Sequence, residues 1–483
     1  MEYIINGYSP ASMFRFFEDI AAIPHGSGNE SGIADYICDF AAARSLEYLR
    51  DGANNVLIRK PASKGYEDHP VVMLQGHTDM VCEKNADVLH DFERDPLKLS
   101  IKDGWLSAEG TTLGGDDGAA VVMMLAILDD NDLPHPELEC LFTTAEETSM
   151  GGANAFDYTP IKARRIINLD SEDEGTVTVS CAGSADCVFE LETESTDYNG
   201  RSLRLTVKGL AGGHSGAEIN LCRANANKIM ARLLARLYED EPFKLVSVSG
   251  GSKRNAIARE AYAEICVIDE VRATEVLLNE EARITSELSA ADAGFRLHVG
   301  KGRRVSSAMT YRSTSAAINL LLLTPDGVVA MSPSIENFVR TSTNLGVVTT
   351  DAESGRITAC AMARSSVDSE LDALIVRLSR LAKLIGANLT VGGRYSGWAP
   401  AENSALADAY AETFEARNKG EKARIAGIHA GLECGIIISR LEGDADAISI
   451  GPNMRDIHTP AERLDLASCE RTYLYVTDML KKL

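Results

Sequence analysis

The sequence lacks several features that mark other classes of protein. None of its ten cysteines forms a C-x-x-C pair, which argues against a zinc ribbon and against a small disulfide framework. The longest wholly apolar run, residues 119–128, is too short to cross a bilayer. The first residues carry neither a basic segment nor an apolar segment, so we expect no secretory signal. These absences favour a protein of the reducing cytoplasm.

Positive charge is also scarce. Lys and Arg number 48 against 71 Asp and Glu, which makes the formal net charge -23. Such a surface repels phosphate backbones and anionic lipids, so we expect neither nucleic acid nor membrane as a partner. No G-x-G-x-x-G motif follows a strand near the start, which disfavours a dinucleotide-dependent enzyme.

The length and the order of the elements predict more than one domain. At about 150 residues per domain, the 483 residues suggest two or three. Strand-like and helical segments alternate in the first third, which is typical of a layered α/β sheet, and this rhythm returns near the end. From about residue 200 the order is instead β-α-β-β-α-β. We therefore predict a main α/β domain from residues 1–184 and 398–483, with a mixed sheet flanked by helices, and an inserted α+β domain over residues 185–397.

Two motifs near the start of the main domain carry candidate metal ligands. After the strand-like run at 71–74, His77 and Asp79 share a face of the extended chain, so one can ligate while the other orients it. Asp116 and Asp117 stand in a glycine-rich turn directly before the apolar run 119–128. Each motif also has an ordinary interpretation, as a surface histidine in the first case and as a helix N-cap in the second.

Three later segments add further candidates. Glu146 and Glu147 follow a strand-like run and can project in different directions, although a solvated acidic pair has the same appearance. Asp170 closes the apolar run 166–169, where a plain acidic loop is the alternative. His458 precedes the tetrad at 459–462, whose threonine, proline and glutamate predict the start of a helix.

These groups are expected to converge. In an open α/β sheet the ligand crevice lies at the carboxyl ends of the strands, where all these residues fall. Two histidines with several carboxylates suit Zn²⁺, and one carboxylate that bridges two ions would suit a two-metal hydrolase. The spacing alone does not decide which of the adjacent aspartates, Asp116 or Asp117, would bridge.

Several of the motifs together resemble a known family. The runs GHTDM, TTLGGDDG, AEETSMGGA, INLDSE and HTPAE, in this order, are similar to the metal-site motifs of the co-catalytic zinc aminopeptidase, carboxypeptidase and aminoacylase superfamily. The runs GGHSG and HAGLECG and the length resemble its aminoacyl-histidine dipeptidase branch, also called cytosol non-specific dipeptidases. The resemblance implies a catalytic main domain and an inserted lid and dimerisation domain.

The resemblance also implies roles for individual residues. One zinc ion would be held by His77, Asp116 and Asp170, and a second by Asp116, Glu147 and His458, so that Asp116 bridges. Asp79 would orient His77. Glu146 would be the general base that deprotonates the attacking water and later protonates the leaving amine.

Residues outside this set are expected to hold the substrate. His214 resembles the lid histidine that stabilises the developing oxyanion. Asn255 and Arg364 resemble substrate-holding lid positions, and a guanidinium suits a terminal carboxylate, although Arg364 can equally be an ordinary strand arginine. Gly431 and Glu433 lie in a loop that resembles the substrate-carboxylate loop.

The prediction is therefore a metal-dependent dipeptidase that acts on small unblocked dipeptides, including Xaa-His and β-alanyl-histidine. Its expected cofactors are two Zn²⁺ ions per subunit, with Mn²⁺ or Co²⁺ as substitutes. Its expected partners are the dipeptide and a second copy that binds through the lid domain. Two alternatives remain, an N-acyl amino acid hydrolase of the same superfamily and a non-catalytic metal-binding scaffold.

Overall fold

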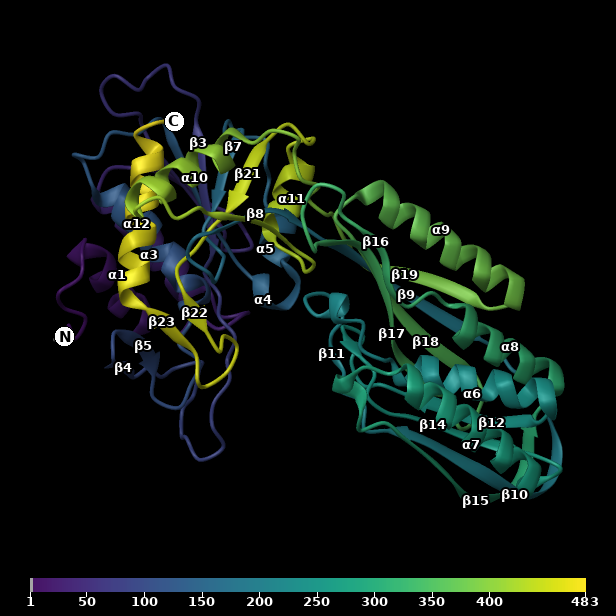
Figure 1. Ribbon diagram of the computed structural model, residues 1–483. Helices are drawn as coiled ribbons and strands as arrows, with labels where there is room; N and C mark the ends of the chain where they lie inside the picture. Colours follow the sequence, from purple (N-terminus) through teal and green to yellow (C-terminus); the bar gives the residue numbers. More distant parts are fainter. Residues whose placement is uncertain (1–2) are drawn as a thin grey trace. The chain divides into compact units, whose positions relative to one another are not determined.

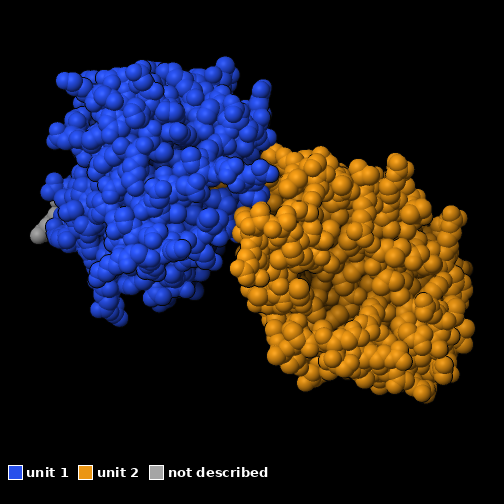
Figure 2. All heavy atoms as spheres, turned by 45° about the horizontal axis from the view of Figure 1, so that its top comes forward, with its two compact units in different colours: residues 1–180, 400–427, 432–483 blue, residues 181–399, 428–431 orange. Residues whose placement is uncertain are grey.

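The structure is a computed structural model that describes residues 3–483. These residues form two compact units (Figure 2). Unit 1 consists of the described residues up to 180 together with 400–427 and 432–483, and unit 2 consists of 181–399 and 428–431. The predicted boundaries lay at 184 and 398, and the segment 428–431 was expected in the main domain. In the structure this segment pairs with unit 2, because the Ala182 amide donates hydrogen bonds to the carbonyls of Ile428 and Ala430.

Unit 1 is built on an eight-stranded mixed sheet (Figure 1). In spatial order its strands are β1 (Glu47–Arg50), β2 (Val56–Lys60), β6 (Leu138–Thr143), β3 (Val72–His77), β7 (Arg165–Asn168), β21 (Asp446–Ser449), β8 (Thr176–Cys181) and β20 (Arg424–Ile428). The central strands β6, β3, β7 and β21 are parallel, whereas β1, β2 and β8 pair antiparallel to their neighbours. Strands from both ends of the chain thus share one sheet, as the returning α/β rhythm predicted.

The helices of unit 1 flank this sheet. They are α1 (Ala11–Ala21), α2 (Ser31–Ala43), α3 (Gly115–Asp129), α4 (Glu146–Ser149), α5 (Gly151–Ala155), α10 (Ala405–Arg417), α11 (Glu433–Arg440) and α12 (Leu466–Leu480). Helix α3 packs on β3 and also contacts α1 and α12, so it is covered on several sides. All its residues from 115 to 128 are buried, which explains why its sequence is apolar all round rather than amphipathic. A separate small sheet contains β22 (Met454–Arg455), β23 (Arg463–Asp465), β5 (Trp105–Ala108) and β4 (Leu99–Lys102).

Unit 2 is an antiparallel sheet covered by helices. Its strands follow the order β15 (Arg296–Met309), β10 (Ser195–Lys208), β14 (Ala261–Cys266), β12 (Lys244–Gly250), β17 (Val339–Thr350), β18 (Ile357–Ser365), β9 (Gly183–Leu191) and β19 (Asn388–Tyr395), with β16 (Gly327–Met331) on β17. A two-stranded piece joins β11 (Gly213–His214) to β13 (Ala256–Ile257). The helices are α6 (Ala226–Asp240), α7 (Glu270–Glu287), α8 (Tyr311–Leu323) and α9 (Asp368–Ile385).

The core of unit 2 lies between this sheet and its helices. Helix α6 packs on β10, β14 and β17, helix α9 packs on β9, β18 and β19, and α8 contacts both helices. The three helices therefore cover one face of the sheet, and the buried apolar residues of helices and strands form one cluster. The predicted α/β fold with an inserted α+β domain is confirmed. No helix among residues 3–483 is long and apolar enough to cross a membrane.

Candidate metal centre

Three adjacent parallel strands bring candidate ligands to one edge of the unit 1 sheet. Strands β6, β3 and β7 are neighbours and run in the same direction, so their carboxyl ends meet. His77 is the last residue of β3, Glu146 and Glu147 begin α4 after β6, and Asp170 follows β7. Asp116 lies in the first turn of α3 and His458 in the turn between β22 and β23. Residues that are hundreds of positions apart thereby approach one another.

Asp116 lies at the centre of this cluster. Its Oδ1 is 3.2 Å from His77 Nε2, and its Oδ2 is 3.1 Å from His458 Nε2. His458 Nε2 is also 3.0 Å from Glu147 Oε1. Two groups of three residues have possible ligand atoms that all lie within 4.8 Å of one another. The first group is His77, Asp116 and Asp170, and the second is Asp116, Glu147 and His458. A third group of this kind joins His77, Glu146 and Glu147.

This donor set fits a pair of divalent cations. Imidazole nitrogens and carboxylate oxygens are the borderline-to-hard ligands that Zn²⁺, Mn²⁺ and Co²⁺ accept. The carboxylate of Asp116 is shared by two of the groups, and its two oxygens face different histidines. A carboxylate in that position can bind two ions at once.

The electrostatics of the cluster also favour cations. Burial opposes ionisation of Asp116, but hydrogen bonds from two histidines outweigh it and hold the pKa of this carboxyl well below its usual range. Hydrogen bonds to Asp116 and Glu147 raise the pKa of His458 to about 10. Burial raises the pKa of Asp170 well above its usual range and the pKa of Glu146 to about 8. So many carboxyl groups in a buried space repel one another, and divalent cations would relieve that repulsion.

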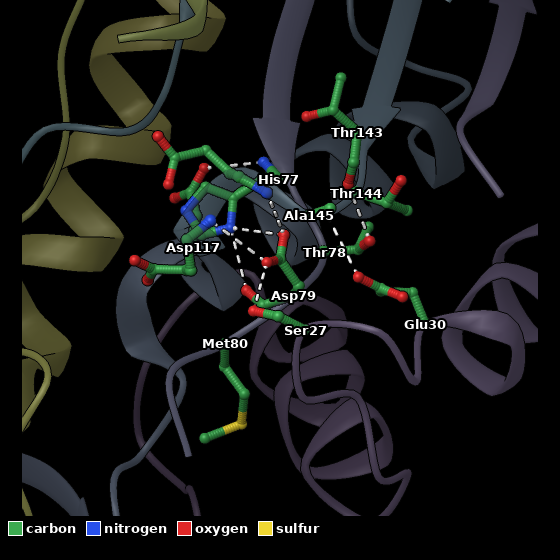
Figure 3. Close-up of polar contacts among 12 residues, drawn as sticks. Ser27, Glu30, His77, Thr78, Asp79, Met80, Asp117, Thr143, Thr144 and Ala145 are labelled. Atoms are coloured by element: carbon green, nitrogen blue, oxygen red, sulfur yellow. Dashed lines mark hydrogen bonds and ion pairs between the residues drawn. The ribbon is translucent and has the colours of Figure 1, made fainter. Parts of the chain in front are cut away.

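Asp79 connects the histidine of β3 to the start of α4 (Figure 3). Its Oδ1 lies 3.5 Å from His77 Nδ1 and accepts a hydrogen bond of 2.9 Å from the Glu146 amide. The Nδ1 of His77 also lies 2.9 Å from the Asp79 carbonyl oxygen. Because these oxygens hold the proton on Nδ1, Nε2 can give up the proton that it shares with Asp116 and ligate a metal instead.

The adjacent aspartates differ in their surroundings. Asp116 belongs to two of the possible ligand groups, whereas Asp117 belongs to none of the groups found among residues 3–483. Asp117 is fully buried, and its Oδ2 accepts a 3.3 Å hydrogen bond from the backbone N–H of His77. The structure therefore distinguishes Asp116 from Asp117, which their spacing in the sequence could not do.

The prediction that a helix starts at residues 459–462 is wrong. These residues form turns, and the last helix begins at Leu466, where the side chain of Asp465 caps the Ser468 amide at 3.1 Å. The amide of Glu462 donates a 3.0 Å hydrogen bond to the Thr459 carbonyl, but its side chain does not turn back to Thr459. Its buried carboxylate instead accepts hydrogen bonds of 2.8 Å from the amides of Leu113 and Gly115. Glu462 thereby fixes the loop before Asp116, a long-range contact that the local sequence pattern does not reveal.

Four of the predicted substrate residues lie in unit 2, and two of these, His214 and Arg364, are close to each other. A Cβ added to Gly216 would lie 3.0 Å from Cε1 of His214 and 3.3 Å from Nε of Arg364, so both side chains border this glycine. The Nδ1 of His214 accepts hydrogen bonds from the amides of Gly216 and Ala217 at 3.3 and 2.9 Å. Burial and the charge of Arg364 lower the pKa of His214. A lower pKa favours the neutral ring, and because Nδ1 accepts, the proton of the neutral ring lies on Nε2, where it can donate a hydrogen bond.

The guanidinium of Arg364 is buried and forms no ion pair with the described residues, although Asp186 is close enough to feel its charge. The residue is 5% exposed, and its Nε makes no hydrogen bond to any of residues 3–483. Its Nη1 donates a 3.3 Å hydrogen bond to the hydroxyl of Tyr395. Within residues 3–483 it forms no ion pair, which is costly for a buried cation unless a ligand supplies the anion.

The other predicted substrate residues are arranged differently. Asn255, in unit 2, is exposed, and its carbonyl accepts a 2.9 Å hydrogen bond from the Ser215 amide. Gly431 belongs to unit 2 and Glu433 to unit 1, so the loop that carries both is divided between the units. Glu433 is fully buried, and its Oε2 accepts hydrogen bonds of 2.5 Å from Gln75 and 2.6 Å from Thr143. In this structure Glu433 therefore links strands β3 and β6 through hydrogen bonds near their carboxyl ends.

Comparison with known proteins gives relatives over almost the whole chain. The sequence is 37% identical over 479 residues to the cytosol non-specific dipeptidase of Escherichia coli (strain K12), and the match covers 98% of each chain. The fold is similar to that of the aminoacylhistidine dipeptidase of Vibrio alginolyticus, with a TM-score of 0.92, 34% identity and coverage of 99% of this chain and 97% of that one.

A more distant structure shares the fold. The aminopeptidase PepT of Bacillus cereus matches with a TM-score of 0.57 and 16% identity over 98% of this chain and 99% of that chain. The model of peptidase family M20/M25/M40 matches residues 73–482, a range that contains all the possible metal ligands described above. The chain therefore belongs to peptidase family M20/M25/M40 and is a hydrolase of peptide bonds.

Proposed function

We propose that the chain is a dipeptidase that uses two Zn²⁺ ions and acts on small unblocked dipeptides, including Xaa-His and β-alanyl-histidine. The observation that carries this proposal is the pair of three-residue ligand groups that share Asp116, with Glu146 beside them. The dipeptidase names of the Escherichia coli and Vibrio alginolyticus proteins support the substrate class. The name of the Escherichia coli protein also supports a cytoplasmic location.

In this proposal the metal ligands are divided between two ions. His77, Asp116 and Asp170 would hold one, and Asp116, Glu147 and His458 the other. Bound cations supply positive charge, which makes a water molecule more acidic and polarises the scissile carbonyl group. All further steps fall to side chains of the chain itself.

Glu146 would move the proton. Its carboxylate would take a proton from the attacking water and give it to the nitrogen of the leaving amino acid. Asp79 accepts a hydrogen bond from the Glu146 amide, which holds the base beside the ligands. His214 would donate a hydrogen bond from Nε2–H to the carbonyl oxygen as negative charge develops there.

The ends of the substrate would be recognised by residues outside the metal set. The buried guanidinium of Arg364, which forms no ion pair with the described residues, would bind the terminal carboxylate. Asn255 and the loop with Gly431 would hold the peptide backbone. Glu433, which is buried against Gln75 and Thr143, would act by positioning that loop.

A substrate panel with defined metals tests the proposal. Protein stripped of metal is expected to be inactive and to recover with Zn²⁺, Mn²⁺ or Co²⁺. The holoenzyme is expected to hydrolyse Xaa-His and β-alanyl-histidine. Dipeptide amides, which offer Arg364 no carboxylate, should have kcat/KM values at least about tenfold lower, because a charged hydrogen bond is worth about 1.5–3 kcal/mol. Preference for N-acetyl amino acids would support the acyl hydrolase alternative, and metal binding without any turnover would support a scaffold.

We also propose that the protein forms a homodimer through unit 2. Apolar side chains lie exposed on its helix α9 and on the edge strand β19, namely Val376 at 57%, Leu384 at 84% and Val391 at 40%. An edge strand offers unpaired backbone groups to a second copy. Sedimentation at micromolar concentration is expected to give the mass of two chains, and a single chain would contradict this proposal.

A further inference from the structure

The segment Gly26–Glu30, between α1 and α2, borders the candidate metal centre although none of its residues is a candidate ligand. Gly26 forms a parallel bridge with Met80, and the Ser27 amide donates a 3.3 Å hydrogen bond to the Met80 carbonyl. The segment is thereby attached to the chain just beyond His77 and Asp79. Figure 3 places Ser27 beside Asp79 and Glu30 beside Ala145.

Ser27 makes a direct contact with the carboxylate of Asp79. Its hydroxyl donates a 2.7 Å hydrogen bond to Asp79 Oδ2. The same carboxylate accepts amide hydrogen bonds from Glu146 at 2.9 Å and from Glu147 at 3.3 Å. Asp79 is only 1% exposed, so water does not replace these donors. The hydroxyl of Ser27 therefore helps to fix the rotation of the carboxylate that connects His77 to Glu146 and Glu147.

Glu30 makes the second contact, at the turn before Glu146. Its Oε1 accepts hydrogen bonds from the amides of Ala145, at 3.2 Å, and Gly28, at 2.9 Å. Glu30 is 5% exposed and forms no ion pair with any of residues 3–483. Ala145 has a φ of 52°, in the left-handed region that alanine rarely adopts. A buried acceptor on its amide stabilises this conformation.

We propose that Ser27 and Glu30 are positioning residues for catalysis. Ser27 would hold Asp79, and Glu30 would hold the turn at Ala145, so that the general base Glu146 and the ligand Glu147 leave the turn in the required directions. The proposal rests on the roles proposed above for Glu146 and Glu147. Neither Ser27 nor Glu30 would contact the substrate, because each acts through a neighbouring group.

Replacement of Ser27 tests the first contact. In Ser27→Ala, kcat is expected to fall about 10- to 100-fold with KM within about twofold, as for other groups that orient ligands. The affinity of the metal-free protein for its second Zn²⁺ equivalent, measured by titration calorimetry, is expected to fall about tenfold, because Glu147 loses its fixed position. Ser27→Thr, which keeps the hydroxyl, should recover most of both properties.

A matched control separates this effect from a general loss of hydrogen bonds. Ser63→Ala removes a hydroxyl that donates to the His135 carbonyl at 3.1 Å and accepts from the His135 amide at 2.8 Å, at the opposite end of β6. This variant is expected to keep the wild-type kcat and Zn²⁺ affinity even if its melting temperature falls. Equal losses in Ser63→Ala and Ser27→Ala, or wild-type kcat and Zn²⁺ affinity in Ser27→Ala, would overturn the proposal for Ser27.

Replacement of Glu30 tests the second contact. Glu30→Gln keeps an acceptor oxygen for the Ala145 amide and is expected to retain at least about half of the wild-type kcat, whereas Glu30→Ala should lose about tenfold or more. Equal activity of the two variants at equal thermal stability would overturn the proposal for Glu30. A wild-type protein that bound zinc but cleaved no dipeptide would contradict the proposed function. The effect of Ser27→Ala on Zn²⁺ affinity would still be testable, because this affinity is measured without substrate.

Discussion

Glu146→Gln is expected to lower kcat for a good dipeptide about 10²- to 10⁴-fold, the usual contribution of a general base. Glutamine has nearly the same shape but cannot accept the proton of the attacking water. The backbone N–H that Asp79 holds is unchanged by the substitution, so the turn should persist. The protein is therefore expected to keep both metal equivalents, measured by elemental analysis after gel filtration, and a KM close to that of the wild type.

The control for this variant is Glu109→Gln, which changes an exposed glutamate of the same unit and is expected to leave kcat unchanged. A Glu146→Gln protein with nearly wild-type kcat would show that another group takes the proton. Loss of one metal equivalent would instead show that Glu146 is a ligand. The geometry allows this, because Glu146 forms a possible ligand group with His77 and Glu147. The two measurements together thus distinguish a base from a ligand.

The architecture was largely predictable because its signals are local. The apolar run 119–128 lies within the buried helix α3, and the strand-like runs near 71–74 and 165–169 lie at the centre of the sheet as β3 and β7. Polar residues directly after such runs fall at the carboxyl edge of a parallel sheet, whatever their distance along the chain. This rule predicted that His77 and Asp170 would lie near each other, and the structure places Nε2 and Oδ1 of these residues 4.0 Å apart.

The errors and omissions come from contacts between distant segments. The tetrad at 459–462 has a good local helix-start pattern, but the side chain of Glu462 accepts hydrogen bonds from the distant amides of Leu113 and Gly115 instead of capping a helix. Ser27 and Glu30 lie in a glycine-rich segment with the appearance of a plain loop, and only the tertiary structure brings them to Asp79 and Ala145. No periodicity in the sequence encodes such partners, because each depends on how separate elements pack.

Asp116→Asn is expected to have the largest effect on metal content. The amide group of asparagine offers one neutral oxygen in place of two charged ones, so it cannot bridge two cations. We expect the variant to retain less than one metal equivalent after gel filtration and to have no measurable dipeptidase activity. The wild-type apoprotein should gain thermal stability when Zn²⁺ is added, because a ligand that binds the native state stabilises it. The Asp116→Asn protein should gain little.

Asp117→Asn is the matched comparison, because it makes the same chemical change one residue away. Asp117 accepts a hydrogen bond from the His77 amide and belongs to no candidate ligand group among residues 3–483, and asparagine keeps an acceptor oxygen for that amide. We expect this variant to keep both metals and at least about a tenth of the wild-type kcat, since one altered hydrogen bond is worth about 0.5–1.5 kcal/mol. If Asp117→Asn lost its metals while Asp116→Asn kept them, the bridging role would pass to Asp117. If both variants kept two metals, neither aspartate would bridge, and the shared-carboxylate arrangement that supports the proposed function would be wrong.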